Sequence, residues 1–225
     1  ILFLASILIG WLLFNRIRIS KRLEQLTLRN RIAGDLHDDI GSALSSIDIN
    51  SRVALAKKEN PLVIQENLAK ISQQARKTMD SMSDIVWSIN PANDSLENML
   101  SRMREFATGI CEPQKIEFVM SEPEDKNITI TEADKRRNIF LIFKEAVNNA
   151  CKYSGCSQLK VSFEKAAKNR LLMRISDNGK GFDEETVKKG NGLQNIRNRA
   201  AQINASVAIE SIIAEGTTIE LAFSV

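Results

Sequence analysis

The chain has 225 residues, 43% of them hydrophobic and 26% charged, which is typical of a globular protein and excludes a disordered one. The length suggests one compact domain plus an elongated part. A formal net charge of +3 is too small for a broad nucleic-acid-binding surface, so no direct nucleic acid binding is expected. Three cysteines without a C-x-x-C pair and a single histidine exclude a disulfide scaffold and a structural zinc site.

The first 14 residues, ILFLASILIGWLLF, carry no charge. They are shorter than the roughly 20 residues that cross a bilayer, so they are interpreted as the C-terminal part of a transmembrane helix, with a buried core helix as the alternative. Arg16, Arg18, Lys21 and Arg22 follow directly, as the positive-inside rule expects on a cytoplasmic flank. The residues after about 15 are therefore expected to be cytoplasmic.

The segment 15–92 is predicted to form an antiparallel helical hairpin. No proline occurs from residue 16 to 57, the pattern breaks at 57–61, and Pro91 stops the second helix. Apolar or small residues recur at steps of three and four and form one stripe, or seam, along each helix. The two seams are Leu23, Leu26, Asn30, Ala33, His37, Ile40, Leu44 and Ile47, then Ile64, Leu68, Ile71, Ala75, Met79, Met82, Val86 and Ile89. A hairpin cannot build a core alone, so two chains are expected to form a homodimeric four-helix bundle.

In the segment 93–225 predicted helices and strands occur together, so the predicted fold class is α followed by a two-layer α/β sandwich. A linking helix is expected at 93–110 with Asn93 as N-cap, a helix at 131–153 opened by Thr131, and another at 193–203. Alternating patterns predict strands at 115–120, 127–130, 158–163, 171–176, 205–211 and 217–224.

Four motifs follow one another in this second half: EAVNNACKYS at 145–154, DNGKGF at 177–182, GNGL at 190–193 and EGTT at 215–218. Glu145 and Asn149 share a helix face, and a carboxylate beside an amide oxygen suits Mg²⁺. Asp177 ends a predicted strand, where it can accept a hydrogen bond from an exocyclic amino group such as that of adenine. Alone, each motif is more often a solvated helix face or a plain turn. Their joint order favours a nucleotide site.

The glycines of these motifs allow the backbone to approach phosphates and to hinge over a ligand. They are Gly179, Gly181, Gly190 and Gly192. Lys152, one turn past Asn148, can add positive charge near the phosphates.

These motifs resemble the N, G1, G2 and G3 boxes of the GHKL ATPase superfamily over residues 97–225. The resemblance implies a Bergerat ATP-binding fold, Mg²⁺ on Asn149, a catalytic Glu145 and a mobile lid between about Phe182 and Gly190. Tyr153 departs from the family, where many members have His. The residues that the resemblance assigns to ATP are Asn148, Asn149, Lys152, Tyr153, Asp177, Gly179, Gly181, Gly190, Gly192, Leu193 and Thr217.

The segment 31–41, RIAGDLHDDIG, resembles the H box of the dimerisation and phosphoacceptor domain of nitrate/nitrite-sensor-like (HisKA_3-type) histidine kinases. His37 is the protein's single histidine, and its helical neighbours Ala33, Gly34 and Gly41 leave room for an approaching domain. The alternative is an ordinary packed or exposed helical histidine. Two interior glycines cost the helix about 1 kcal/mol each relative to alanine, which favours the functional interpretation.

The second resemblance implies a sensor histidine kinase of a two-component system in a bacterial inner (cell) membrane. ATP phosphorylates His37 with Asp38 as the assisting acid, Asp35 and Asp39 being rivals, and the phosphoryl group passes to an aspartate of a response regulator receiver. Ser42 stands where the family's phosphatase motif has Gln, so phosphatase activity is expected to be weak. The alternatives are a catalytically silent, ATP-binding dimeric scaffold and an anti-sigma-type serine kinase.

Overall fold

The computed structural model describes residues 16, 40–57, 59–125, 127–167, 169–183 and 191–225. The chain divides into two compact units, Ile1–Ile85 and Val86–Val225. The apolar segment 1–14, His37, Asp38, Gly190 and most of the expected lid lie outside the described residues. None of the described helices is both long and apolar enough to cross a membrane.

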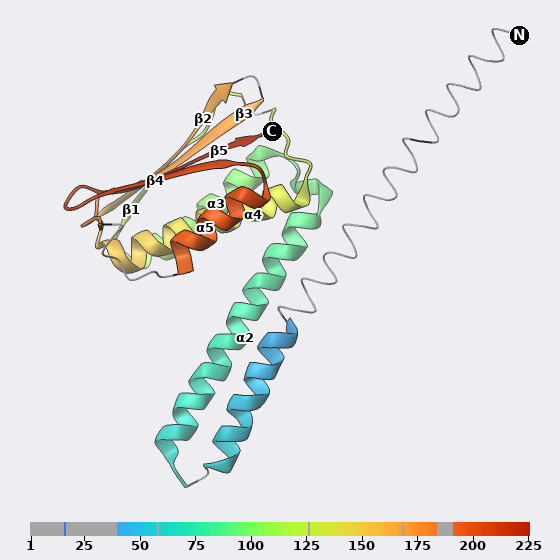
Figure 1. Ribbon diagram of the computed structural model, residues 1–225, viewed down its shortest axis with the longest axis vertical. Coiled ribbons are helices and arrows are strands. Elements are labelled where there is room, and N and C mark those ends of the chain that lie inside the picture. Colours follow the sequence, from blue (N-terminus) through green and yellow to red (C-terminus); the bar gives the residue numbers. More distant parts are fainter. Residues whose placement is uncertain (1–15, 17–39, 58, 126, 168, 184–190) are drawn as a thin grey trace, which may run out of the picture. The chain divides into compact units, whose positions relative to one another are not determined.

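The described part of the first unit is helical. Residues 40–56 form one helix, and α2, Pro61–Ile89, follows after the predicted break (Figure 1). Asn60 starts α2, because its side-chain oxygen accepts a hydrogen bond from the Val63 N–H at 3.3 Å and Pro61 has the φ of a first helical turn. The two predicted helices and the break between them are thus confirmed over this range.

The linking helix α3 spans Leu96–Cys111, and Ser95 is its N-cap, accepting a hydrogen bond from the Asn98 N–H at 3.2 Å. The expectation that Asn93 caps this helix is therefore wrong. Asn93 ends the short 3-10 turn η1, Pro91–Asn93, where its side chain donates to the Trp87 carbonyl at 2.9 Å.

The strand expected at 127–130 is also wrong: it is reduced to an isolated bridge between Ser95 and Thr129. Ile128 and Ile130 are buried in alternation as in a strand, but their backbones pair with the start of α3 instead of the sheet. The Leu96 N–H donates to the Ile128 carbonyl at 2.9 Å, and the Ile130 N–H donates to the Asp94 carbonyl at 2.7 Å.

The helix α4 spans Ala133–Asn149 and continues into a π turn, η3, Ala150–Ser154. It begins two residues later than expected, with Glu132 at the N-cap position and no side-chain cap, so Thr131 does not open it. The helix α5 spans Asn191–Gln202.

Five strands form one sheet in the order β1-β2-β3-β5-β4. They are β1 Glu117–Ser121, β2 Gln158–Ala167, β3 Arg170–Asp177, β4 Ser206–Ile212 and β5 Gly216–Ser224. β1 and β2 are parallel, joined by a crossover through α4, and the other pairs are antiparallel. Helices α3, α4 and α5 lie on one face of the sheet, which confirms the two-layer sandwich (Figure 1).

The core lies between this sheet face and the helices. Met99 and Met103 of α3, Phe143 of α4, and Leu159 and Leu221 of the sheet are fully buried. Because α4 turns Ile139, Ile142, Phe143, Ala146 and Val147 inward, its opposite side, which carries Glu145 and Asn149, is left half-buried.

Candidate nucleotide-binding site

Glu145 and Asn149 lie one turn apart on α4, at the start of α5. An added Cβ at Gly192 would stand 2.4 Å from Glu145 Oε1 and 3.3 Å from Asn149 Nδ2. A larger residue at position 192 would therefore displace the Glu145 carboxylate from its present place beside the start of α5. The free N–H groups of the first turn of α5, which includes Leu193, then lie beside these side chains. A helix N-terminus facing polar side chains is a suitable place for phosphate.

Asp177 is the last residue of β3, as the sequence pattern predicts, and only 9% of it is exposed. Its carboxylate accepts a hydrogen bond from the Gly179 N–H at 2.9 Å. Burial raises the pKa of Asp177, and hydrogen bonds, the strongest from Gly179, oppose this rise. A buried carboxylate with remaining acceptor capacity can recognise an amino group strongly.

The loop after β3 is tied to the end of α4. The Lys180 N–H donates to the Ser154 carbonyl at 2.9 Å, and an added Cβ at Gly179 would stand 2.5 Å from Ser154 Cβ. Gly181 has φ +59° and packs against the backbone of Ile212, which an added Cβ would meet at 2.0 Å. The first and second motifs are therefore in direct contact.

β5 completes this edge of the site. Thr217 lies directly opposite Asp177 in the β3–β5 register. Gly216, before it, has φ +110°, and an added Cβ would stand 1.9 Å from the Asp177 carbonyl oxygen. The sequence interpretation did not include Gly216 or Ser154 among the site residues. The available signal was the position of Gly216 directly before the predicted strand 217–224, but a Gly-Thr pair is too common to be informative.

The remaining expected residues lie near the end of α4. Asn148 is half-buried, while Lys152 and Tyr153 of the π turn are exposed, Tyr153 by 67%. Lys152 can thus reach a ligand from solvent. Among the residues that the structure describes, no three His, Cys, Asp or Glu side chains gather into a metal cluster.

The helix 40–56 begins at the end of the H box and is open around Gly41. Gly41 and Ser42 are exposed, and an added Cβ at Gly41 would meet nothing within 4 Å. Among the residues that the structure describes, packing therefore does not require glycine at position 41.

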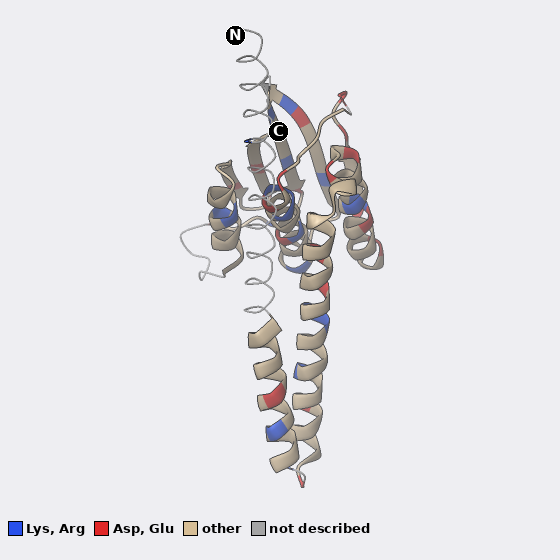
Figure 2. Ribbon diagram, turned by 90° about the vertical axis from the view of Figure 1, so that its right-hand side faces the viewer, with Lys and Arg blue, Asp and Glu red and all other residues tan. Residues whose placement is uncertain are grey.

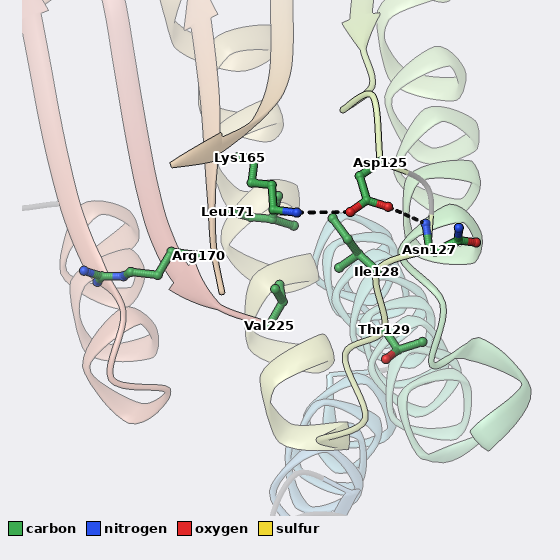
Figure 3. A pocket seen from close by; sticks show the side chains of 8 residues that line it. All are labelled: Asp125, Asn127, Ile128, Thr129, Lys165, Arg170, Leu171 and Val225. Carbon is green, nitrogen blue, oxygen red and sulfur yellow. Dashed lines mark hydrogen bonds and ion pairs between the residues drawn. The ribbon is translucent and has the colours of Figure 1, made fainter. Parts of the chain in front are cut away.

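A separate pocket lies at the other end of β3 and is drawn in Figure 3. Its lining includes Arg170, the first residue of β3, and the ion pair between Lys165 and Asp125 at 3.1 Å. Arg170 and Asp177 are the two ends of β3, seven residue steps or about 23 Å apart, so this pocket is separate from the candidate nucleotide site.

Two family models match the chain. HisKA_3, described as histidine kinase, matches residues 29–94, and HATPase_c, described as histidine kinase-, DNA gyrase B-, and HSP90-like ATPase, matches residues 134–225. The chain is also similar to the sensor histidine kinase YdfH of Bacillus subtilis (strain 168), with 28% identity over 211 residues, 89% of this chain and 51% of that protein. The chain thus spans about half the length of this curated relative.

Solved histidine kinases share the fold. The histidine kinase domain of the blue-light activated histidine kinase from Erythrobacter litoralis EL346 matches with a TM-score of 0.50 and 15% identity, covering 82% of this chain and 94% of that one. The Acinetobacter baumannii histidine kinase AdeS matches with a TM-score of 0.52 and 14% identity, covering 84% and 97%. Both resemblances drawn from the motifs are confirmed: the chain belongs to the histidine kinases, with a HisKA_3-type helical part and an ATP-binding domain of the gyrase B and HSP90-like ATPase family.

Proposed function

We propose that this chain is the kinase part of a two-component sensor that uses ATP to phosphorylate its own His37 and then passes the phosphoryl group to an aspartate of a response regulator. The observation that carries the proposal is the meeting of α4, the β3 loop and the start of α5 at one edge of the sheet. There Glu145 and Asn149 lie beside Gly192, and Asp177 lies opposite Thr217.

In this proposal the adenine amino group donates to Asp177, and the phosphates lie near Gly179, Gly181 and the start of α5. Lys152 adds positive charge from the exposed π turn. Leu193 and Tyr153 flank the nucleotide, and Asn148 supports the same edge. Burial of Asp177 in a site of low dielectric strengthens the single hydrogen bond that selects adenine.

Mg²⁺ is proposed to bind Asn149 together with the phosphates of ATP, with Glu145 close by. The donors present, one amide oxygen and one carboxylate, fit an ion that keeps several waters and shares phosphate oxygens. When bound, the ion neutralises charge on the phosphoryl group that is transferred. Glu145 can also orient a water of this ion.

The chemistry at His37 follows from the imidazole. One ring nitrogen attacks the γ-phosphorus as the bond to the β-phosphate oxygen breaks and ADP leaves. Asp38 accepts a hydrogen bond from the N–H of the other ring nitrogen and stabilises the growing positive charge of the imidazole. In-line attack requires no further covalent chemistry from the protein.

Dimerisation is proposed for the helical hairpin because its large apolar side chains face solvent within one chain. Leu44, Ile49, Leu62, Leu68 and Met79 are each more than half exposed. Burying them against a second copy is the ordinary way to complete a four-helix bundle. Anchorage in the bacterial inner membrane through the segment 1–14, with the remainder cytoplasmic, belongs to the same proposal.

The proposal is tested by incubating the protein with γ-labelled ATP and Mg²⁺. We expect label that is stable in base, labile in acid, and absent from His37→Gln. Acid-stable label, or label that survives His37→Gln, contradicts the proposal, and nucleotide binding without any labelling indicates the silent scaffold.

A second assay addresses Ser42. The protein is mixed with a phosphorylated receiver domain and ADP, and Ser42→Gln is compared with the parent. We expect slow loss of receiver phosphate with Ser42 and faster loss with Gln, which has the longer amide arm. Rapid loss with the parent contradicts weak phosphatase activity.

A further inference from the structure

The guanidinium of Arg136, in the first turn of α4, is only 2% exposed and joins three separate chain segments. Nη2 donates to the Ser88 carbonyl at 2.5 Å, and Nη1 donates to the Ile130 carbonyl and forms an ion pair with Asp94 at 2.6 Å. We call Arg136, Asp94 and the Ser88 and Ile130 carbonyls the Arg136 junction.

Each segment of the junction has a defined place in the chain. Ser88 belongs to the last turn of α2, Asp94 lies between η1 and α3, and Ile130 comes just before α4. The last turn of α2 is also held by Trp87, whose ring lies 5.8 Å from that of Phe140 of α4. Arg102 of α3 lies over both rings, at 4.7 and 4.8 Å.

The Arg136 junction buries a charged group, which costs free energy that an apolar contact would not. Arg136 Nε is buried without a hydrogen-bond partner among the described residues, and burial lowers the pKa of Arg136 while Asp94 opposes that shift. An apolar side chain of similar volume often stabilises such a position as well or better. The guanidinium fixes the relative orientation of the three segments, because its planar donors meet two carbonyls and one carboxylate in a fixed geometry.

The same helix carries the nucleotide site. Glu145 and Asn149 follow Arg136 on α4 after nine and 13 residues, which is about 14 and 20 Å along the helix axis. α2 is one continuous helix of 29 residues, and its last turn is fixed at the beginning of α4. A change in the orientation of that last turn would therefore move α4, the helix that carries Glu145 and Asn149.

We propose that Arg136 is a positioning residue for phosphoryl transfer: it fixes the last turn of α2 to the helix that holds Glu145 and Asn149, and so sets how often bound ATP reaches His37. The inference rests on the proposed function and extends it. It separates two quantities, because the junction lies well away from Asp177 and Asn149. The rate of autophosphorylation depends on the junction, and the affinity for ATP does not.

The test compares Arg136→Lys, which keeps the charge but loses the planar guanidinium donors, and Asp94→Asn, which leaves the buried arginine in place. The matched control is Lys165→Met, which removes the exposed Lys165–Asp125 pair in the same unit (Figure 3). For each protein, single-turnover labelling by γ-labelled ATP gives the rate, and titration with a fluorescent ATP analogue gives the dissociation constant. Hydrogen exchange follows the amides of residues 86–89.

We expect both junction variants to label about 10- to 100-fold more slowly, as small misplacements far from the chemistry can do, with dissociation constants within about twofold of the parent. Exchange at residues 86–89 rises, and Lys165→Met leaves all three readouts unchanged. Equal loss of rate and affinity, or parent-like rates in both variants, overturns the inference. If the parent itself never labels, the proposed function fails instead.

If Arg136→Lys does not fold, Asp94→Asn decides the matter, because its carboxylate is partly exposed and its loss leaves the backbone contacts of Arg136 available. A folded Asp94→Asn protein with faster exchange at 86–89 and an unchanged rate of labelling also overturns the inference.

Discussion

The two units of the molecule bury their apolar side chains very differently. In the second unit Met99, Met103 and Phe143 are completely buried, whereas in the helical hairpin Leu62 and Met79 are 77% and 69% exposed. Figure 2 shows basic and acidic residues in both units, so the presence of charge does not distinguish them. The described part of the second unit encloses a core, and in the proposed dimer a second copy would cover the exposed apolar side chains of the hairpin.

The largest expected effect tests the completeness of the second unit. Phe143→Ala removes a ring that packs against Phe106 and Phe140, so we expect the free energy of unfolding of this unit to fall by about 3–5 kcal/mol. Urea titration followed by near-ultraviolet circular dichroism measures it. Val119→Ala, at a 38% exposed site, is the control and should change it by less than about 0.5 kcal/mol. Similar losses of unfolding free energy in Phe143→Ala and Val119→Ala would show that burial in this core does not determine its stability.

The second prediction concerns the open surface of the hairpin. Leu68→Lys combined with Met79→Lys places two charges where apolar contact is expected, so the dimer dissociation constant should rise at least about 100-fold. Analytical ultracentrifugation over a concentration series measures it. Val119→Lys in the second unit is the control and should leave association unchanged. A parent protein that sediments as a stable monomer would contradict the proposed dimer directly.

The third prediction separates function from fold within the second unit. Asp177→Asn removes the charged acceptor, so ATP affinity should fall about 10- to 100-fold. The variant should remain at least as stable as the parent at neutral pH, because it no longer buries a carboxylate whose ionisation the burial opposes. Calorimetric titration and thermal unfolding give the two values. A strongly destabilised variant would show that Asp177 is mainly structural.

The fourth prediction follows from the sign of the Asp177 pKa shift. Because burial raises this pKa in the folded protein, the group favours folding at low pH, and this contribution is lost as pH rises through the raised value. In the proposed site adenine recognition needs the ionised form, so ATP affinity should fall as pH falls through the same value. Titrations from pH 8 down to the ordinary aspartate pKa of 3.8 should therefore show the two trends with opposite signs. Asp177→Asn should remove the contribution of this group to both trends.

The smallest expected effect uses the cysteines, all of which lie in the second unit. Burial raises the pKa of the Cys111 thiol to about 12, and its sulfur lies 3.7 Å from that of half-buried Cys151. At pH 8 iodoacetamide should label Cys151 first and Cys111 only after unfolding, as mass spectrometry can follow. Equal rates of labelling would show that the core around Cys111 opens readily.

Much of this architecture could be predicted from periodicity. A long three- and four-residue pattern located α2, and alternation located five strands, with Asp177 at the end of one. The errors came where short patterns are ambiguous. Ile128 and Ile130 alternate as in a strand, yet their backbones bond to the start of α3. Asn93 and Ser95 are both good cap residues, and only the packed structure selects Ser95.

The candidate site shows the same limits of sequence analysis. Residue type, spacing and family resemblance were enough to propose Glu145, Asn149 and Asp177, and the structure places the first two beside Gly192 and the third opposite Thr217. Gly216 could not, because its role depends on the Asp177 carbonyl approaching from a strand that precedes it by about 40 residues. Arg136 was not identified either. A lone arginine in a helix is ordinarily a solvated side chain, and its partners are as far away in the sequence as Ser88.

The place of β5 in the sequence has a consequence for the newly made protein. Thr217, opposite Asp177, lies on the last described strand, whereas the hairpin is made first. During translation the described helices of the hairpin leave the ribosome many residues before β5 does. Under the proposed function, subunits would pair on the ribosome before Thr217 meets Asp177, and ATP could be used only after β5 is in place.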